Sequence, residues 1–219
     1  MIEVEHIVSV RKPEKPDVVM SRMDYVIICQ VIERLNEIGM NDDELSFLLG
    51  KPNNYVFGFI VKPSDKNRFH EDQIDLLPYL LDCPFSRIIV NGTPSGNIHL
   101  HHTKEINEDG YKGFSHIIYN ENGEGTRVIW KKKQAPKGTT RKTNQSLLAM
   151  LKQWVADGYF NRNQNALEIY KKLKAENVAF PISELEKCLK VLCGTGQQLL
   201  EKESIDGLLM YWNPLRQTD

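Results

Sequence analysis

The highest concentration of like charges in this sequence is a basic run from residue 127 to residue 142. It holds seven Lys and Arg residues and no acidic residue: Arg127, Lys131, Lys132, Lys133, Lys137, Arg141 and Lys142. Clustered cations neutralise phosphate groups, and such binding weakens steeply as the salt concentration rises. Residues 131–144 also contain Pro, Gly and Thr and have little to bury, so a solvated linker is an equally good interpretation.

Three histidines, at positions 99, 101 and 102, could be metal ligands. In an extended strand His99 and His101 lie on one face and His102 on the other, so only two side chains converge. A zinc site needs more ligands, and these would have to come from distant residues such as Glu105 or His116. We interpret the histidines as polar strand residues and expect no metal.

Sequence motifs that carry catalysis or cofactor binding are missing from the chain. It has no P-loop, no dinucleotide-binding fingerprint, no GxSxG and no HExxH. Cys188 and Cys193 are five residues apart, which does not match a zinc-binding pair. We therefore expect a non-enzymatic protein without a cofactor. An enzyme that uses the histidine strand is the most distant of the alternatives, after the two that are stated at the end of this section.

The bulk composition is that of an ordinary globular protein. The 219 residues are 41% hydrophobic and 26% charged, with a formal net charge of −1, which allows one or two domains. No apolar run approaches the ~20 residues of a membrane span, and the acidic, mixed N-terminus differs from a signal peptide. Cys29 and Cys83 lie in apolar helical patterns, as buried thiols do. We expect a reduced, cytoplasmic protein that does not bind membranes.

The elements that position these residues centre on the stretch from Asp42 to Val61. Leu45 and Leu49 are four residues apart and so share one face of a helix. Gly50 follows at the position where the chain must leave the helix, often with positive φ. Pro52 suits the first turn of a second helix. Val56, Phe59 and Ile60 give that helix its buried stripe.

This stretch resembles the helix-turn-helix of the lambda-repressor-like, or XRE-type, regulators. The motif positions are filled in register by Leu45, Ser46, Leu49, Gly50 and Val56, whereas Lys51 stands where the family has an apolar residue. The resemblance covers residues 20–90, with further helices expected at 23–38, 69–81 and 85–90. It implies a domain of five helices that binds DNA.

The resemblance also implies which residues face a DNA groove. These are Asn53, Asn54, Phe57 and Gly58, with Tyr55 near a phosphate, and we add Lys51 to the expected DNA-binding residues. Asn pairs bidentately with adenine, so Asn53 or Asn54 would specify a base. The charge balance opposes this reading, because residues 1–95 hold ten Lys and Arg against fifteen Asp and Glu. The apolar Phe57 and Val61 would suit protein contact instead.

Strand and helix patterns divide the rest of the chain. Residues 2–10 alternate as a strand, and the strands at 98–106, 114–119 and 127–130 are its expected partners. From about 145 to 214, three helical patterns are followed by two short strands around Asp206 and Gly207. This order resembles the winged-helix class, whose reading helix would be 183–192. Residues 143–219 hold nine cations and nine acids, so this part could equally bind a protein.

The sequence therefore predicts a mainly α protein with a small antiparallel β element. Its expected parts are a lambda-repressor-like domain at 1–95, a β-hairpin with a basic linker at 96–144, and a winged-helix-like domain at 145–219. The leading hypothesis is a transcriptional regulator that reads double-stranded DNA as a homodimer. The alternative is an adaptor that uses its helix-turn-helix folds to bind other proteins, with the C-terminal domain as one contact.

Overall fold

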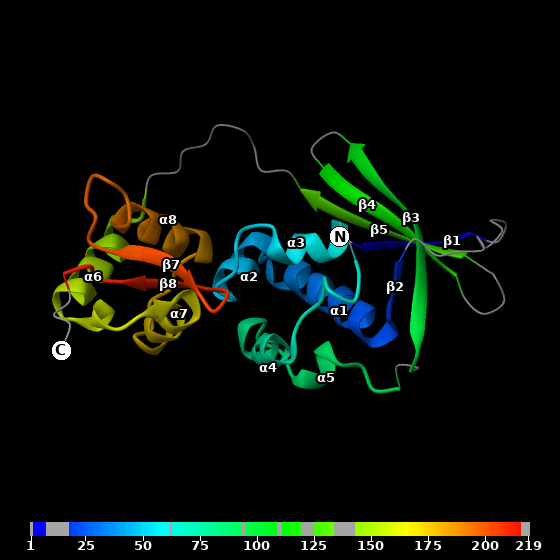
Figure 1. Ribbon diagram of the computed structural model, residues 1–219, viewed down its shortest axis with the longest axis horizontal. Coiled ribbons are helices and arrows are strands. Elements are labelled where there is room, and N and C mark those ends of the chain that lie inside the picture. Colours follow the sequence, from blue (N-terminus) through cyan, green and yellow to red (C-terminus); the bar gives the residue numbers. More distant parts are fainter. Residues whose placement is uncertain are drawn as a thin grey trace. The chain divides into compact units, whose positions relative to one another are not determined.

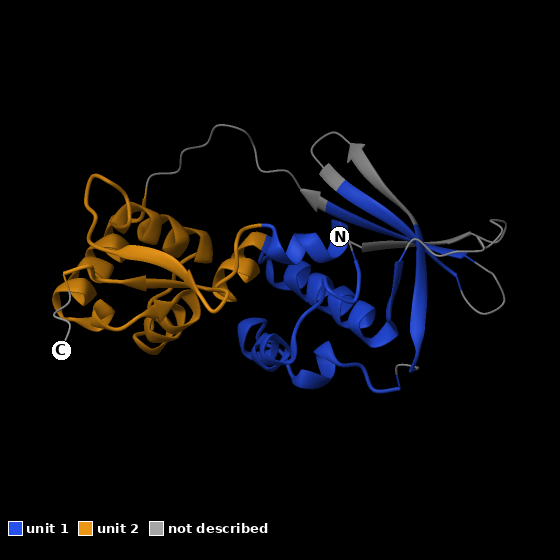
Figure 2. Ribbon diagram, viewed as in Figure 1, with its two compact units in different colours: residues 1–42, 54–137 blue, residues 43–53, 138–219 orange. Residues whose placement is uncertain are grey.

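The chain divides into two compact units, which are coloured separately in Figure 2. Unit 1 comprises residues 1–42 and 54–137, and unit 2 comprises residues 43–53 and 138–219. The structure is a computed structural model (Figure 1). It describes residues 2–7, 18–61, 63–92, 95–108, 111–119, 125–133 and 143–215.

Unit 1 combines a five-stranded antiparallel sheet with several helices. Its helices are α1 (Arg22–Ile38), α3 (Tyr55–Val61), α4 (Glu71–Leu80) and α5 (Phe85–Ile88). Its strands are β1 (Ile2–Ile7), β2 (Val18–Ser21), β3 (Asn97–Glu108), β4 (Tyr111–Tyr119) and β5 (Gly125–Lys133). The strand order is β1-β5-β4-β3-β2, and every neighbouring pair is antiparallel.

The prediction of a mainly α fold is corrected by this sheet, since the chain is mixed α/β. The central strands form more than a hairpin because two N-terminal strands extend it at both edges. As expected, the first strand pairs with the central ones, with Val4 opposite Val128. The short strand β2, which the sequence pattern did not predict, pairs with β3 through Met20 and Ile98. Residues 8–10 of the predicted first strand lie outside the described residues.

Helix α1 is the longest helix of unit 1. The Ser21 hydroxyl accepts a hydrogen bond from the Asp24 N–H at 3.5 Å at its start, and Gly39 ends it with a φ of 70°. Gly39 can adopt this left-handed conformation because it has no Cβ. The buried face carries Ile28, Val31 and Leu35, whose spacing is that of one side of a helix.

One face of the sheet packs against α1 and α3. Phe114 on β4 pairs in register with Trp130 on β5, so both side chains point to the same face. The rings of Trp130 and Tyr25 from α1 make a T-shaped contact, with centroids 6.1 Å apart. The Phe114 ring meets Phe57 from α3 at 5.7 Å. These aromatic contacts join helices and sheet into one core.

Unit 2 contains three longer helices and a small antiparallel sheet in its described part. The elements are α6 (Gln145–Ala156), η1 (Tyr159–Asn161), β6 (Gln164–Asn165), α7 (Ala166–Ala175), α8 (Ile182–Leu192), β7 (Glu201–Ile205) and β8 (Leu208–Trp212). The strand order is β6-β8-β7. Helix α2 (Asp42–Leu48) begins at the last residue of the first segment of unit 1 and continues into unit 2.

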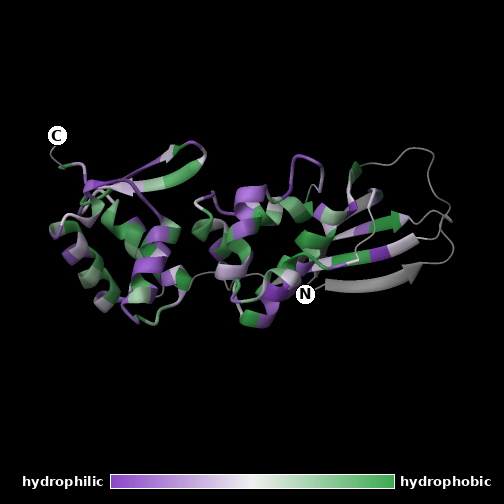
Figure 3. Cartoon of the chain, turned by 90° about the horizontal axis from the view of Figure 1, so that it is seen from below, coloured by the Kyte–Doolittle hydropathy of each residue, from purple (hydrophilic) through white to green (hydrophobic). Residues whose placement is uncertain are grey.

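Side-chain caps begin two of these helices. Asn144 accepts from the Leu147 N–H at 3.1 Å at the start of α6. At α7, Asn165 accepts from the Glu168 N–H at 2.9 Å while Glu168 accepts from the Asn165 N–H at 2.8 Å, a reciprocal capping box. Hydrophobic and hydrophilic residues alternate around the helices (Figure 3). The fully buried core includes Leu151, Phe160, Ile169, Leu173, Leu185 and Leu189.

Candidate nucleic-acid interface

The turn that follows α2 has the geometry that its glycine predicts. Gly50 has a φ of 66°, and its N–H donates to the Phe47 carbonyl at 3.0 Å. The next N–H, that of Lys51, donates to the Ser46 carbonyl at 2.9 Å. These two bonds satisfy carbonyl groups at the end of the helix. Gly50 therefore ends α2 as expected.

The second helix of the predicted motif begins later than the sequence indicates. Asn54 also has a left-handed backbone, with a φ of 66°, and such a residue cannot lie inside a right-handed helix. Its carbonyl accepts from the Gly58 N–H at 2.8 Å, so the helix starts at Tyr55. Pro52 and Asn53 consequently belong to the connecting turn rather than to the first helical turn. Both Asn53 and Asn54 are exposed.

The boundary between the two units falls inside this motif. Lys51 and Asn53 belong to unit 2, whereas Asn54 and all of α3 belong to unit 1. The predicted groove-facing residues are thus distributed over both units. The residues of unit 2 and those of unit 1 are therefore described separately below.

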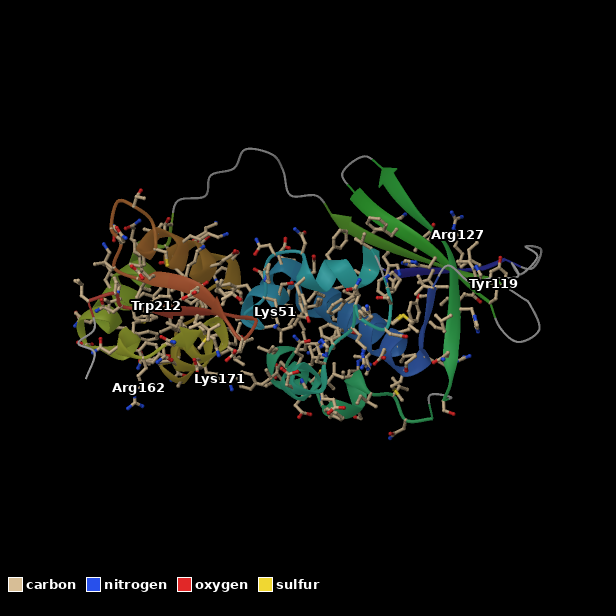
Figure 4. All side chains as sticks on the ribbon, in the orientation of Figure 1. Lys51, Tyr119, Arg127, Arg162, Lys171 and Trp212 are labelled. Atoms are coloured by element: carbon tan, nitrogen blue, oxygen red, sulfur yellow. The ribbon has the colours of Figure 1, made fainter. Side chains whose placement is uncertain are left out.

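Within unit 2, the segment 43–53 is held against α8 and the β7–β8 hairpin. The Gly50 carbonyl accepts from the Leu209 N–H at 2.7 Å. Lys51 Nζ, labelled in Figure 4, donates to the Gly207 carbonyl at 2.7 Å. The Ser183 N–H, at the start of α8, donates to Glu44 Oε1 at 3.1 Å. The segment is therefore bound at both the helix and the turn of the hairpin.

Between these two attachment points lies a surface cavity of about 340 Å³. Three lysines from different elements line it: Lys51 from the turn, Lys190 from α8 and Lys202 from β7. Asn53, a predicted base-reading residue, lines the same cavity. The other lining residues are Phe47, Gly50, Pro52, Glu186, Ser204, Leu209 and Tyr211. An amide and three ammonium groups thus converge with a single carboxylate, which gives the cavity an excess of positive charge.

The lysines of α8 and β7 differ in whether they have a carboxylate partner. Lys190 Nζ lies 2.6 Å from Glu186 Oε1 on the same helix, and Lys187 Nζ lies 2.8 Å from Glu184 Oε1. Lys202 is exposed and has no carboxylate partner within the described part of the chain. Exposed ion pairs contribute little energy and exchange readily for other anions. Lys202 and Lys190 are therefore the cations best placed to meet a phosphate here.

In unit 1, α3 has no exposed residue. Gln73 Nε2 donates to the Tyr55 hydroxyl at 3.2 Å, and burial raises the pKa of Tyr55. The Phe57 ring is turned toward Phe114 on the sheet. A Cβ placed on Gly58 would meet nothing within 4 Å, so there is open space beside this glycine. The predicted reading helix is thus mainly a packing element of unit 1.

The basic run begins within the sheet rather than in a linker. Strand β5 extends to Lys133, and its last residues pair with β4 from Gly113 to Tyr111. Lys131 is half-buried, and the Arg127 side chain projects from the sheet (Figure 4). For Lys132 and Lys133 only the strand backbone is described. Lys137, Arg141 and Lys142 lie outside the described residues.

Two histidines of the sheet, His101 and His116, are packed in the interior of unit 1. His101 is buried with its ring against Tyr119, at a centroid distance of 5.2 Å. His116 is fully buried, and burial lowers its pKa to about 4 although a hydrogen bond with the backbone of Ile60 opposes the shift. Across the residues that the structure describes, no group of three His, Cys, Asp or Glu side chains is placed to hold a metal ion.

The cysteines of the chain are free thiols. Burial raises the pKa of Cys29 to about 12 and those of Cys188 and Cys193 to about 11. A thiol is nucleophilic only as the thiolate. These three cysteines are consequently protonated and unreactive at neutral pH.

No protein family, curated protein or solved structure matches this chain. Of the helices described in the structure, none has the length and apolar character needed to cross a membrane.

Proposed function

We propose that this chain is a non-enzymatic DNA-binding protein and that its DNA-contacting surface is the lysine-lined cavity face of unit 2. One observation carries the proposal: Lys51 and Asn53 of the predicted motif line one cavity with Lys190 and Lys202. The sequence of residues 1–95 lacks the cations that such a motif needs. In unit 2, α8 and β7 supply those cations beside the amide.

The order of elements in unit 2 supports the same proposal. Along the chain, the short strand β6 follows α6, the helices α7 and α8 come next, and the β7–β8 hairpin is last. In the sheet, β6 pairs with β8, so the strand order is β6-β8-β7. This is the arrangement that a winged-helix resemblance implies, with α8 as the reading helix and the hairpin as the wing. The cavity lies between these two elements. We propose that unit 2 is winged-helix-like and that residues 20–90 are lambda-repressor-like.

Each polar group has a distinct role in this proposal. Lys190 and Lys202 bind phosphate groups, which contributes affinity for any sequence and depends on the salt concentration. Asn53 is exposed and can pair bidentately with an adenine edge. The basic segment 127–142 binds further phosphates. The protein acts in the cytoplasm. It binds DNA as a homodimer, because one short reading element covers few base pairs.

Fluorescence anisotropy with a labelled mixed-sequence duplex tests the proposal. The wild-type chain is expected to bind DNA with an affinity that falls steeply with salt. A double variant, Lys190→Ala with Lys202→Ala, is expected to bind more weakly at every salt concentration. Arg162→Ala with Lys171→Ala is the matched control, since both residues are exposed and neither lines the cavity. Equal binding by the two double variants contradicts the proposed surface.

The alternative, an adaptor that binds proteins, is favoured by a different observation. Unit 2 already holds a peptide segment, residues 43–53, on the face between α8 and the hairpin. A face that binds one segment by backbone hydrogen bonds can bind another of similar shape. Absence of any salt-dependent DNA binding by the wild-type chain, together with a stable complex with a protein partner, would favour this function.

A further inference from the structure

Unit 1 contains a cavity of its own, of about 180 Å³. It lies among the end of α1, the residues that follow it, α3 and strand β5. All of the residues that line it belong to unit 1: Ile32, Leu35, Asn36, Met40, Asn41, Asp42, Phe57, Ile60, Trp130 and Lys131. Of these residues, the DNA-binding proposal uses only Lys131, as a cation of the basic segment 127–142, and it gives the cavity itself no role.

Most of the residues that line the cavity are apolar. Ile32, Leu35, Ile60 and Trp130 are buried, and Phe57 is half-buried. An apolar cavity of about 150 Å³ is large enough to bind benzene. The cavity in unit 1 therefore has the size and lining for a single aromatic ring, and two of its lining residues, Phe57 and Trp130, are themselves aromatic.

The polar residues of the same cavity carry both signs of charge. Lys131 is half-buried and Asp42 is buried, at 8% exposure. A buried carboxylate is stabilised by a cationic neighbour, and an ammonium group by an anionic one. Asn36 and Asn41 are exposed and add amide donors and acceptors. A ligand that matches this lining has an apolar ring and, at its other end, an ammonium and a carboxylate group.

We infer that the cavity of unit 1 binds a free amino acid with a single aromatic ring. The ring occupies the apolar part between Phe57 and Trp130. The ligand's ammonium group faces Asp42 and its carboxylate faces Lys131. This inference does not rest on the proposed DNA-contacting cavity of unit 2, because it concerns a cavity in another unit. Lys131 is the one cation that it shares with the basic segment 127–142.

The cavity is also connected to the segment that carries Lys51 and Asn53. Met40 to Asp42 immediately precede the segment 43–53 in the chain, and Phe57 follows it closely. A ligand that orders both flanks changes the freedom of the segment between them.

Binding to the purified full-length chain tests the inference, by calorimetry and by following the indole N–H signal of Trp130 in NMR spectra. The probes are L-phenylalanine, phenethylamine, which lacks the carboxylate, and 3-phenylpropionate, which lacks the ammonium group. L-Phenylalanine is expected to bind most tightly and to shift the Trp130 signal. Alanine, which lacks the ring, is expected not to bind.

Two variants that preserve side-chain size separate the charge contacts. Asp42→Asn is expected to weaken L-phenylalanine and phenethylamine roughly tenfold, a loss of about 1.4 kcal/mol, and to leave 3-phenylpropionate unchanged. Lys131→Met is expected to weaken L-phenylalanine and 3-phenylpropionate and to leave phenethylamine unchanged. The control variants Asp65→Asn and Lys66→Met change exposed residues outside the cavity.

The outcomes decide the inference directly. Tight binding of all three aromatic probes without discrimination would overturn the amino-acid assignment, as would equal effects of cavity and control variants. The absence of saturable binding of any probe at millimolar concentration overturns the site itself. Circular dichroism and the melting temperature of each variant establish that it is folded, so a loss of binding is not attributed to unfolding.

Discussion

The backbone N–H of Leu209 donates a hydrogen bond of 2.7 Å to the carbonyl of Gly50. Strand β8 lies between β7 and β6, but β6 reaches only Tyr211 and Met210. Alternate N–H groups of β8 point away from β7, so the Leu209 donor lies on the β6 side, beyond the end of that strand. Gly50 satisfies it. The turn of the predicted helix-turn-helix thereby completes the sheet edge of unit 2.

This relationship makes Gly50 intolerant of a side chain. The substitution Gly50→Ala is expected to lower the free energy of unfolding by about 1–2 kcal/mol, because an L-residue in the left-handed region is strained. The new Cβ would also lie 3.3 Å from Leu208 Cδ2. Chemical denaturation followed by circular dichroism measures the change.

The same substitution at Gly58 is the matched control. Gly58 lies inside α3, and a Cβ there would meet nothing within 4 Å. Gly58→Ala is expected to stabilise the protein by about 0.5–1 kcal/mol, since glycine loses more backbone entropy in a helix than alanine does. Opposite signs for the two substitutions support the geometry of the turn, and a neutral Gly50→Ala variant contradicts it.

The lysine-lined cavity predicts a specific change in salt dependence. Replacing Lys190 and Lys202 together by Ala is expected to reduce the slope of log affinity against log salt concentration by about 2, because each phosphate contact releases roughly one counterion. Anisotropy titrations over a series of salt concentrations give the slope. A slope that matches wild type would show that neither lysine contacts the backbone of DNA.

Asn53 is expected to affect specificity rather than affinity in general. Once a preferred sequence has been selected from a random duplex library, Asn53→Ala should weaken binding to it by about 1–3 kcal/mol. Binding to unrelated duplexes should hardly change. The control is Gln145→Ala, which removes an exposed amide at the start of α6. Equal losses on preferred and unrelated DNA would exclude Asn53 from base recognition.

The local conformation of the motif was predictable from sequence, because it depends on neighbouring residues. Gly50 ends α2 with positive φ, and Val56, Phe59 and Ile60 are buried as their spacing indicates. The environment of Phe57 was not predictable. Its ring packs on Phe114, which is remote in sequence, and no local pattern specifies such a partner.

The candidate site was predictable only in part for the same reason. Lys51 and Asn53 could be selected from the motif, but Lys190 and Lys202 come from α8 and β7. The charges of α8 are mixed in sequence, and Lys190 lies four residues after Glu186, with which it pairs. The sequence of this helix therefore did not indicate a positively charged surface. Because Asn54 has a left-handed backbone, α3 begins only at Tyr55. The local sequence Asn-Asn-Tyr did not indicate this conformation.

The buried His116 predicts how stability depends on pH. Burial lowers its pKa from 6.5 to about 4 in the folded chain, so the unfolded chain binds more protons between these values. The free energy of unfolding should therefore fall as the pH decreases from 6.5 toward 4, by on the order of 3 kcal/mol for this group, and the contribution should level off below 4.

A variant isolates this contribution. His116→Leu removes the titrating group, and its stability should lose less between pH 6.5 and pH 4 than that of the wild-type chain. His99→Gln, at a half-buried position on β3, is the control and should retain the wild-type pH dependence. Urea denaturation at a series of pH values measures both. Should His116→Leu retain the full pH dependence, protonation of His116 is not what destabilises the folded chain in acid.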